Sequence, residues 1–137
     1  MSLTSKLFYA AMFAAIVVLG FTGIGVFLTG HAPMTHWVLM IHMAAAPVFA
    51  LGLAGVAVTW ADLCRADSRP QLGCMARALF WIILACGLVV ILSGAVPMTP
   101  LYGSAGQHTL YLTHRWAGIG LAAAVLLHLP AIRPRKT

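Results

Sequence analysis

Four apolar segments constrain the fold of this chain more than any other feature. They cover residues 7–29, 36–61, 76–97 and 107–130. An α-helix needs about 20 residues to cross the hydrocarbon core of a bilayer, and each segment reaches or exceeds that length. Only 7% of the 137 residues are charged, against about a quarter in soluble proteins. The sequence therefore predicts an all-α integral membrane four-helix bundle that forms a single membrane domain over residues 1–137.

The basic residues predict how this bundle is oriented. Short loops rich in Lys and Arg stay on the cytoplasmic side of a membrane, whereas the loops 30–35 and 98–106 contain no charged residue. We therefore expect an up-down-up-down topology with both termini in the cytoplasm. The net charge of +6 then reflects topology and contact with anionic lipid, and no nucleic-acid partner is expected. The residues that set this orientation are Lys6, Arg65, Arg69, Arg77, Arg133, Arg135 and Lys136.

A histidine pattern occurs in both halves of the chain. The segment 36–61 opens with His36 and has His42 six residues later, and the segment 107–130 opens with His108 and has His114 six residues later. Each pattern follows a predicted outward loop. We interpret the two halves as a weak internal repeat of a two-helix unit.

His42 and His114 are the strongest candidates for chemistry. A histidine inside a membrane span is costly unless it is paired, which makes it a functional candidate by default. Both residues lie six or seven positions past the expected helix start, at a depth of about 9–10 Å on two helices that run in the same direction. Two imidazoles at one depth on two helices are what axial ligation of haem iron requires. The spacing therefore favours a haem between them.

Three further residues are assigned to this site. Gly23 and Gly118 would give a macrocycle room to approach the helix backbones, although glycines also serve close helix packing in lipid. Arg115 lies inside the membrane region, where its charge needs a partner or a route to water. A haem propionate is a suitable partner because a guanidinium binds a carboxylate with two hydrogen bonds; snorkelling toward the outer surface is the alternative.

His128 indicates where a second haem would bind. It follows His114 by fourteen residues, which on a helix returns to nearly the same face about 21 Å further along. The segment 7–29 offers no histidine opposite it, so Met12, another unusual ligand, a ligand from another subunit or five-coordination would be needed. The alternative is a histidine at the cytoplasmic interface that hydrogen-bonds lipid headgroups, water or a quinone.

The last segment resembles a known family. The run Thr113-His114-Arg115-Trp116-Ala117-Gly118, with a second histidine at position 128, is similar to the last haem-binding helix of the four-helix cytochrome b superfamily. That superfamily includes bacterial cytochrome b561 and the membrane cytochrome b subunits of formate dehydrogenase and nickel–iron hydrogenase. The resemblance implies that His42 and His114 ligate one haem b and that His128 supplies half of a second ligand pair. The segment 7–29 departs from the family pattern because it has no histidine.

The resemblance also implies a function. It predicts a subunit of a larger oxidoreductase complex in the bacterial inner membrane, which transfers electrons between quinone or quinol and an extracytoplasmic redox subunit and is not catalytic alone. A copper-handling membrane protein is one alternative, because Met34, Met40 and Met43 stand near histidines as in copper(I) proteins. A haem-free structural membrane anchor is the other.

Overall fold

The computed structural model describes residues 3–30, 34–60 and 74–131. These residues form four long helices, α1 (Leu3–Thr29), α2 (His36–Trp60), α3 (Cys74–Ala95) and α4 (Ser104–Ala131), and a short 3-10 helix, η2 (Val96–Met98), after α3. No strand occurs in this part of the chain. The predicted all-α fold is therefore confirmed. Helices α1, α3 and α4 begin two to four residues before the apolar segments, because the first helical turn also accommodates polar residues that an apolar pattern does not mark.

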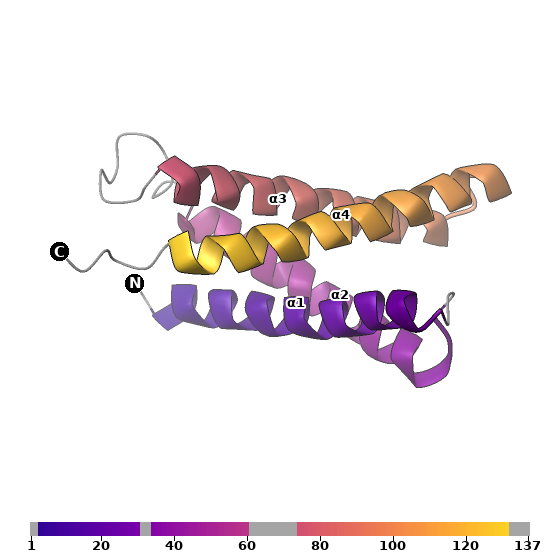
Figure 1. Ribbon diagram of the computed structural model, residues 1–137, viewed down its shortest axis with the longest axis horizontal. Coiled ribbons are helices and arrows are strands. Elements are labelled where there is room, and N and C mark those ends of the chain that lie inside the picture. The colour runs from indigo at the N-terminus through magenta and orange to yellow at the C-terminus, as the bar shows by residue number, and fades with distance from the viewer. Residues whose placement is uncertain (1–2, 31–33, 61–73, 132–137) are drawn as a thin grey trace. The chain divides into compact units, whose positions relative to one another are not determined.

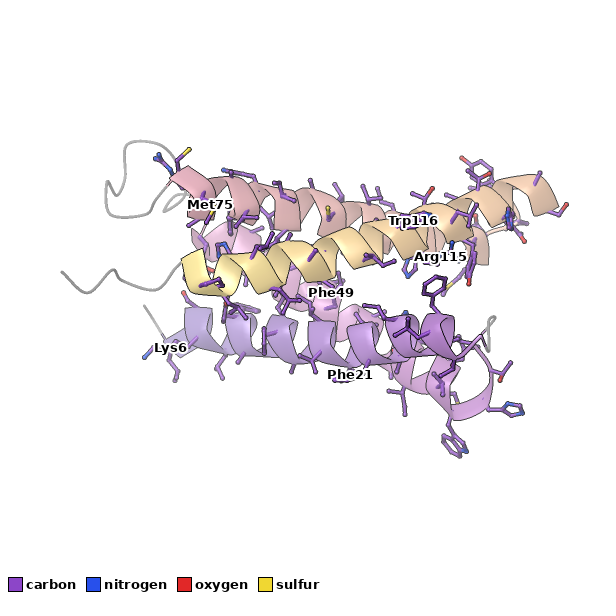
Figure 2. All side chains as sticks on the ribbon, viewed as in Figure 1. Lys6, Phe21, Phe49, Met75, Arg115 and Trp116 are labelled. Carbon is purple, nitrogen blue, oxygen red and sulfur yellow. The ribbon has the colours of Figure 1, made fainter. Side chains whose placement is uncertain are left out.

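All four long helices are long and apolar enough to cross a membrane. Large apolar side chains cover their outer surfaces, as Phe21 on α1 and Trp116 on α4 illustrate (Figure 2). Phe21 is 79% exposed, a placement that is unfavourable in water and suits the acyl chains of a bilayer. The fold is accordingly that of a multi-pass membrane protein with lipid as its solvent.

The chain divides into two compact units, Met1–Ala57 and Val58–Thr137. The first unit contains α1 and most of α2, which we call the first hairpin. Its helices run antiparallel: Gly52 in the second half of α2 faces Met12 in the first half of α1, and His42 near the start of α2 reaches Thr22 toward the end of α1 (Figure 1).

Glycine permits a very close approach of the two helices of the first hairpin. A Cβ atom on Gly52 would lie 2.9 Å from the backbone nitrogen and Cα of Met12, closer than non-bonded atoms tolerate. Next to it, a Cβ atom on Gly55 would overlap the ring of Phe8. Small residues on one helix that receive the backbone of its neighbour are the usual packing device inside membranes.

The second unit contains α3, η2 and α4, which we call the second hairpin. Helices α3 and α4 lie side by side and antiparallel (Figure 1). Pro97 belongs to η2 rather than to α3, consistent with its missing N–H and its fixed φ, and the chain turns from there into α4. Gly120 on α4 has room beside it, since a Cβ atom there would meet the Sγ atom of Cys86 only at 3.9 Å.

Candidate functional site

His42 is held by a hydroxyl group of the neighbouring helix. Its Nδ1 atom lies 2.7 Å from Oγ1 of Thr22. The Thr22 hydroxyl has a single hydrogen, and its oxygen also lies 2.8 Å from the carbonyl oxygen of Val18. When that hydrogen is directed to Val18, the Thr22 oxygen accepts a hydrogen bond from the imidazole. In this arrangement Nδ1 of His42 carries the proton and Nε2 carries the lone pair.

His114 adopts the same protonation pattern for a different reason. Its Nδ1 atom lies 3.0 Å from the backbone carbonyl oxygen of Val90 on α3. A carbonyl oxygen only accepts hydrogen bonds, so Nδ1 is the donor and again Nε2 carries the lone pair. Oγ of Ser93 lies 3.3 Å from the same nitrogen and donates its own hydrogen to the carbonyl oxygen of Val89 at 2.6 Å.

A glycine lies beside each of these two rings. A Cβ atom on Gly23 would be 3.6 Å from Cε1 of His42, and a Cβ atom on Gly94 would be 3.1 Å from Cε1 of His114. Each histidine thus packs against a hydroxyl residue followed by a glycine, Thr22-Gly23 on α1 and Ser93-Gly94 on α3. We call these two dipeptides the hydroxyl–glycine pairs.

The hydroxyl–glycine pairs extend the internal repeat beyond the histidine spacing. Thr22 precedes His42 by 20 residues, and Ser93 precedes His114 by 21 residues. Gly23 was predicted from the sequence as a residue that lets a macrocycle approach the helix, whereas Thr22 and Ser93 were not predicted. The signal that would have found them is a Ser/Thr-Gly dipeptide at nearly the same distance before the histidine in each half.

This geometry matches what metal-binding histidines need. An imidazole that binds a metal through Nε2 nearly always donates its Nδ1–H to a carbonyl, carboxylate or similar acceptor, which fixes the tautomer and makes the ring a better ligand. His42 belongs to the first unit and His114 to the second. Each hairpin therefore supplies one imidazole whose Nδ1 atom has an oxygen neighbour on the adjacent helix.

His128 has a different environment. Its side chain is only 7% exposed and lies close to the backbone of Ala76 at the start of α3. Its buried Nδ1 atom has no hydrogen-bond partner among the residues that the structure describes. Met12, the methionine considered opposite it, is buried in the first unit with its backbone against Gly52. His128 is thus a buried ring with one bonding position unused.

Arg115 and Gly118 follow His114 on α4. Arg115 is half-buried, and its guanidinium carbon lies 5.5 Å from the ring centroid of Trp116 (Figure 2). This distance permits a cation–π interaction. A Cβ atom on Gly118 would meet nothing within 4 Å, so substitution there is not blocked by the surrounding described residues.

The remaining histidines do not join these residues. His36 and His108 are exposed at the first turns of α2 and α4. The backbone of His36 has a positive φ of 52°, a conformation that non-glycine residues seldom adopt. His31 lies outside the described residues. Within residues 3–30, 34–60 and 74–131, no group of three or more His, Cys, Asp or Glu side chains is placed to hold a metal ion.

Comparison with known proteins adds no family assignment. No family model, no curated protein and no solved structure matches this chain.

Proposed function

We propose that this chain is a membrane cytochrome b subunit that transfers electrons between quinone and a redox partner through haem b held by His42 and His114. The observation that carries the proposal is a contact that these two histidines share. In both, Nδ1 lies within hydrogen-bond distance of an oxygen on the neighbouring helix, a contact that suits the tautomer with the proton on Nδ1 and the lone pair on Nε2. Two membrane-embedded imidazoles prepared in this way fit the donor set of a bis-histidine haem.

Each hairpin would hold one of the two histidines in place. Thr22 orients the His42 ring, the Val90 carbonyl orients the His114 ring, and Gly23 lies in van der Waals contact with the edge of the His42 ring. Arg115 provides a positive charge one residue after His114 that suits a propionate group. Haem iron, when bound, supplies a one-electron carrier.

The same proposal places the chain in a bacterial inner membrane with both termini in the cytoplasm. It rests on the uncharged loops 30–35 and 98–106 and on basic residues such as Lys6 and Arg77 at the opposite helix ends. The remaining basic residues that predict this topology lie outside the described residues. They are Arg65, Arg69, Arg133, Arg135 and Lys136. His42 and His114 are then nearer the outer face. An extracytoplasmic redox subunit is the partner that this position favours.

His128 is included in the proposal as the ligand of a second haem or as a hydrogen-bond partner of a quinone. Its support is the unused Nδ1 atom of a buried ring. A buried polar atom without a partner costs about 1–3 kcal/mol. That cost is avoided if a ligand binds there.

A copper(I) site is the second candidate, and one contact favours it. The methyl group of Met34 and the Cε1 atom of His42 both lie within 4 Å of the Cβ position of Gly23, so a thioether and an imidazole are neighbours within the first hairpin. Such a pair is a donor set for copper(I). The copper reading gives no role to His114.

A pyridine-haemochrome spectrum of the purified protein, with metal analysis of the same sample, tests these readings. We expect stoichiometric haem b in the wild type and its loss in His42→Ala and in His114→Ala. His108→Ala is the matched control because His108 is an exposed histidine on the same helix as His114. Full haem content in both site variants would overturn the proposal. Copper without haem would favour the second candidate, and neither cofactor would indicate a structural anchor.

A further inference from the structure

We propose that Thr22 is the positioning residue of the candidate site: its hydroxyl sets the tautomer of His42, whereas the backbone sets that of His114. As a statement about a haem ligand, this inference rests on the proposed function. As a statement about the two imidazoles, it stands on the hydrogen bonds alone.

The contacts of Thr22 favour an acceptor role toward the ring. Its hydroxyl oxygen lies 2.8 Å from the carbonyl oxygen of Val18 and 3.2 Å from that of Leu19. Donation of the hydroxyl hydrogen to a preceding carbonyl is common for threonine inside helices. With the hydrogen directed there, the oxygen presents lone pairs to Nδ1 of His42, 2.7 Å away.

The second hairpin does not depend on a side chain in this way. Nδ1 of His114 lies closer to the carbonyl oxygen of Val90, at 3.0 Å, than to the hydroxyl of Ser93, at 3.3 Å. Removal of the Ser93 hydroxyl leaves the carbonyl acceptor in place. Loss of the hydroxyl should therefore affect His42 in the first hairpin but not His114 in the second.

Replacement of Thr22 by valine tests the role of the hydroxyl group alone. Valine has nearly the same shape but no acceptor, so the N–H of His42 loses this partner. The ring is then no longer held in the Nδ1–H form. In the Nε2–H form the proton must move from Nε2 to Nδ1 before Nε2 can ligate a metal. Partners of metal-binding histidines typically contribute 10–100-fold in affinity.

The first measurement uses the apoprotein and needs no cofactor. With 15N-labelled histidine in detergent micelles and signals assigned with His42→Ala and His114→Ala, we expect the Nδ1–H tautomer for both rings in the wild type. In Thr22→Val the His42 signal should shift toward the Nε2–H form, while His114 keeps its signal. A wild-type His42 in the Nε2–H form would overturn the inference, even if the variant failed to fold.

The second measurement uses the haem-loaded protein. We expect Thr22→Val to lower haem affinity about 10–100-fold and to raise the reduction potential, because a ring that loses its Nδ1–H acceptor donates less electron density to ferric iron. Each tenfold change in the one-electron equilibrium corresponds to about 59 mV. Thr22→Ser should restore both values, and Ser93→Ala should leave both near those of the wild type.

The outcomes separate this inference from the proposed function. Normal haem content with no change of affinity or potential in Thr22→Val would overturn the positioning role and leave the haem proposal intact. Equal effects of Thr22→Val and Ser93→Ala would overturn the asymmetry. A wild type without haem would overturn the proposed function, and the tautomers in the apoprotein would still test the role of Thr22.

Discussion

The two hairpins meet the same chemical requirement with different groups. Nδ1 of His42 contacts a threonine hydroxyl, and Nδ1 of His114 contacts a backbone carbonyl. The difference has a local cause. Gly94 follows Val90 by four residues, one helical turn along α3, and its missing side chain leaves the Val90 carbonyl accessible to His114 from the side. The comparison teaches that a helix can present an acceptor either by adding a hydroxyl or by removing a side chain.

The hairpins also differ in how closely their helices approach. Gly52 receives the backbone of Met12, with a Cβ position only 2.9 Å away, whereas Gly120 faces the end of a side chain, Cys86 Sγ, at 3.9 Å. A side chain can move aside, but a helix backbone cannot. Gly52 is therefore less tolerant of an added side chain than Gly120.

The largest effect is expected from Gly52→Ala. Its Cβ atom would meet the Met12 backbone at 2.9 Å, so the helices of the first hairpin must separate, at a cost of about 1–3 kcal/mol. Unfolding in mixed micelles by an added denaturing detergent measures this loss. Gly20→Ala is the matched control on α1, since nothing lies within 4 Å of its Cβ position. Equal stability of the two variants would contradict the close approach at Gly52.

The second largest effect is expected at position 128, where the two halves of the internal repeat differ. His128 follows His114 by fourteen residues, and the corresponding residue of the first hairpin is the buried Val56. In the apoprotein, His128→Leu removes the partnerless Nδ1 atom and also the hydrogen bond of the ring to the Ala76 backbone, and the net result should be a rise of about 1 kcal/mol in the free energy of unfolding. The same detergent titration measures the gain. A loss of stability would show that His128 makes a structural interaction that the leucine cannot replace.

If His128 ligates a second haem, His128→Leu also lowers haem content from two to one. The pyridine-haemochrome assay measures haem content independently of stability. His128 would then distinguish the two hairpins in function as well as in sequence.

The smallest effect compares the glycines beside the two rings. A Cβ atom on Gly94 would lie 3.1 Å from Cε1 and 3.2 Å from Nδ1 of His114, whereas one on Gly23 would lie 3.6 Å from Cε1 of His42. Gly94→Ala should displace the His114 ring by a few tenths of an ångström and weaken haem binding about fivefold, or about 1 kcal/mol. Gly23→Ala should bind haem as the wild type does. Haem titration of both variants measures the difference, and a greater loss in Gly23→Ala would contradict the ring positions.

The sequence alone determined the four membrane helices, because the length of an apolar run is a local property and a bilayer leaves a spanning chain few alternatives to a helix. It also identified His42 and His114 as candidates, since a histidine is conspicuous in an apolar segment. It did not predict what holds them. The acceptors for their Nδ1 atoms stand 20 to 24 residues earlier in the chain, on a neighbouring helix, and one of them is a backbone carbonyl, which every residue possesses.

Only the tertiary structure could select Thr22 and the Val90 carbonyl, because the selection depends on which faces of two antiparallel helices meet. The burial of His128, with an unused nitrogen, was decided in the same way. Spacing along one helix fixes only the direction of a side chain and not its neighbours. Helix positions thus followed from the sequence, whereas the tautomers of the two histidines followed from packing.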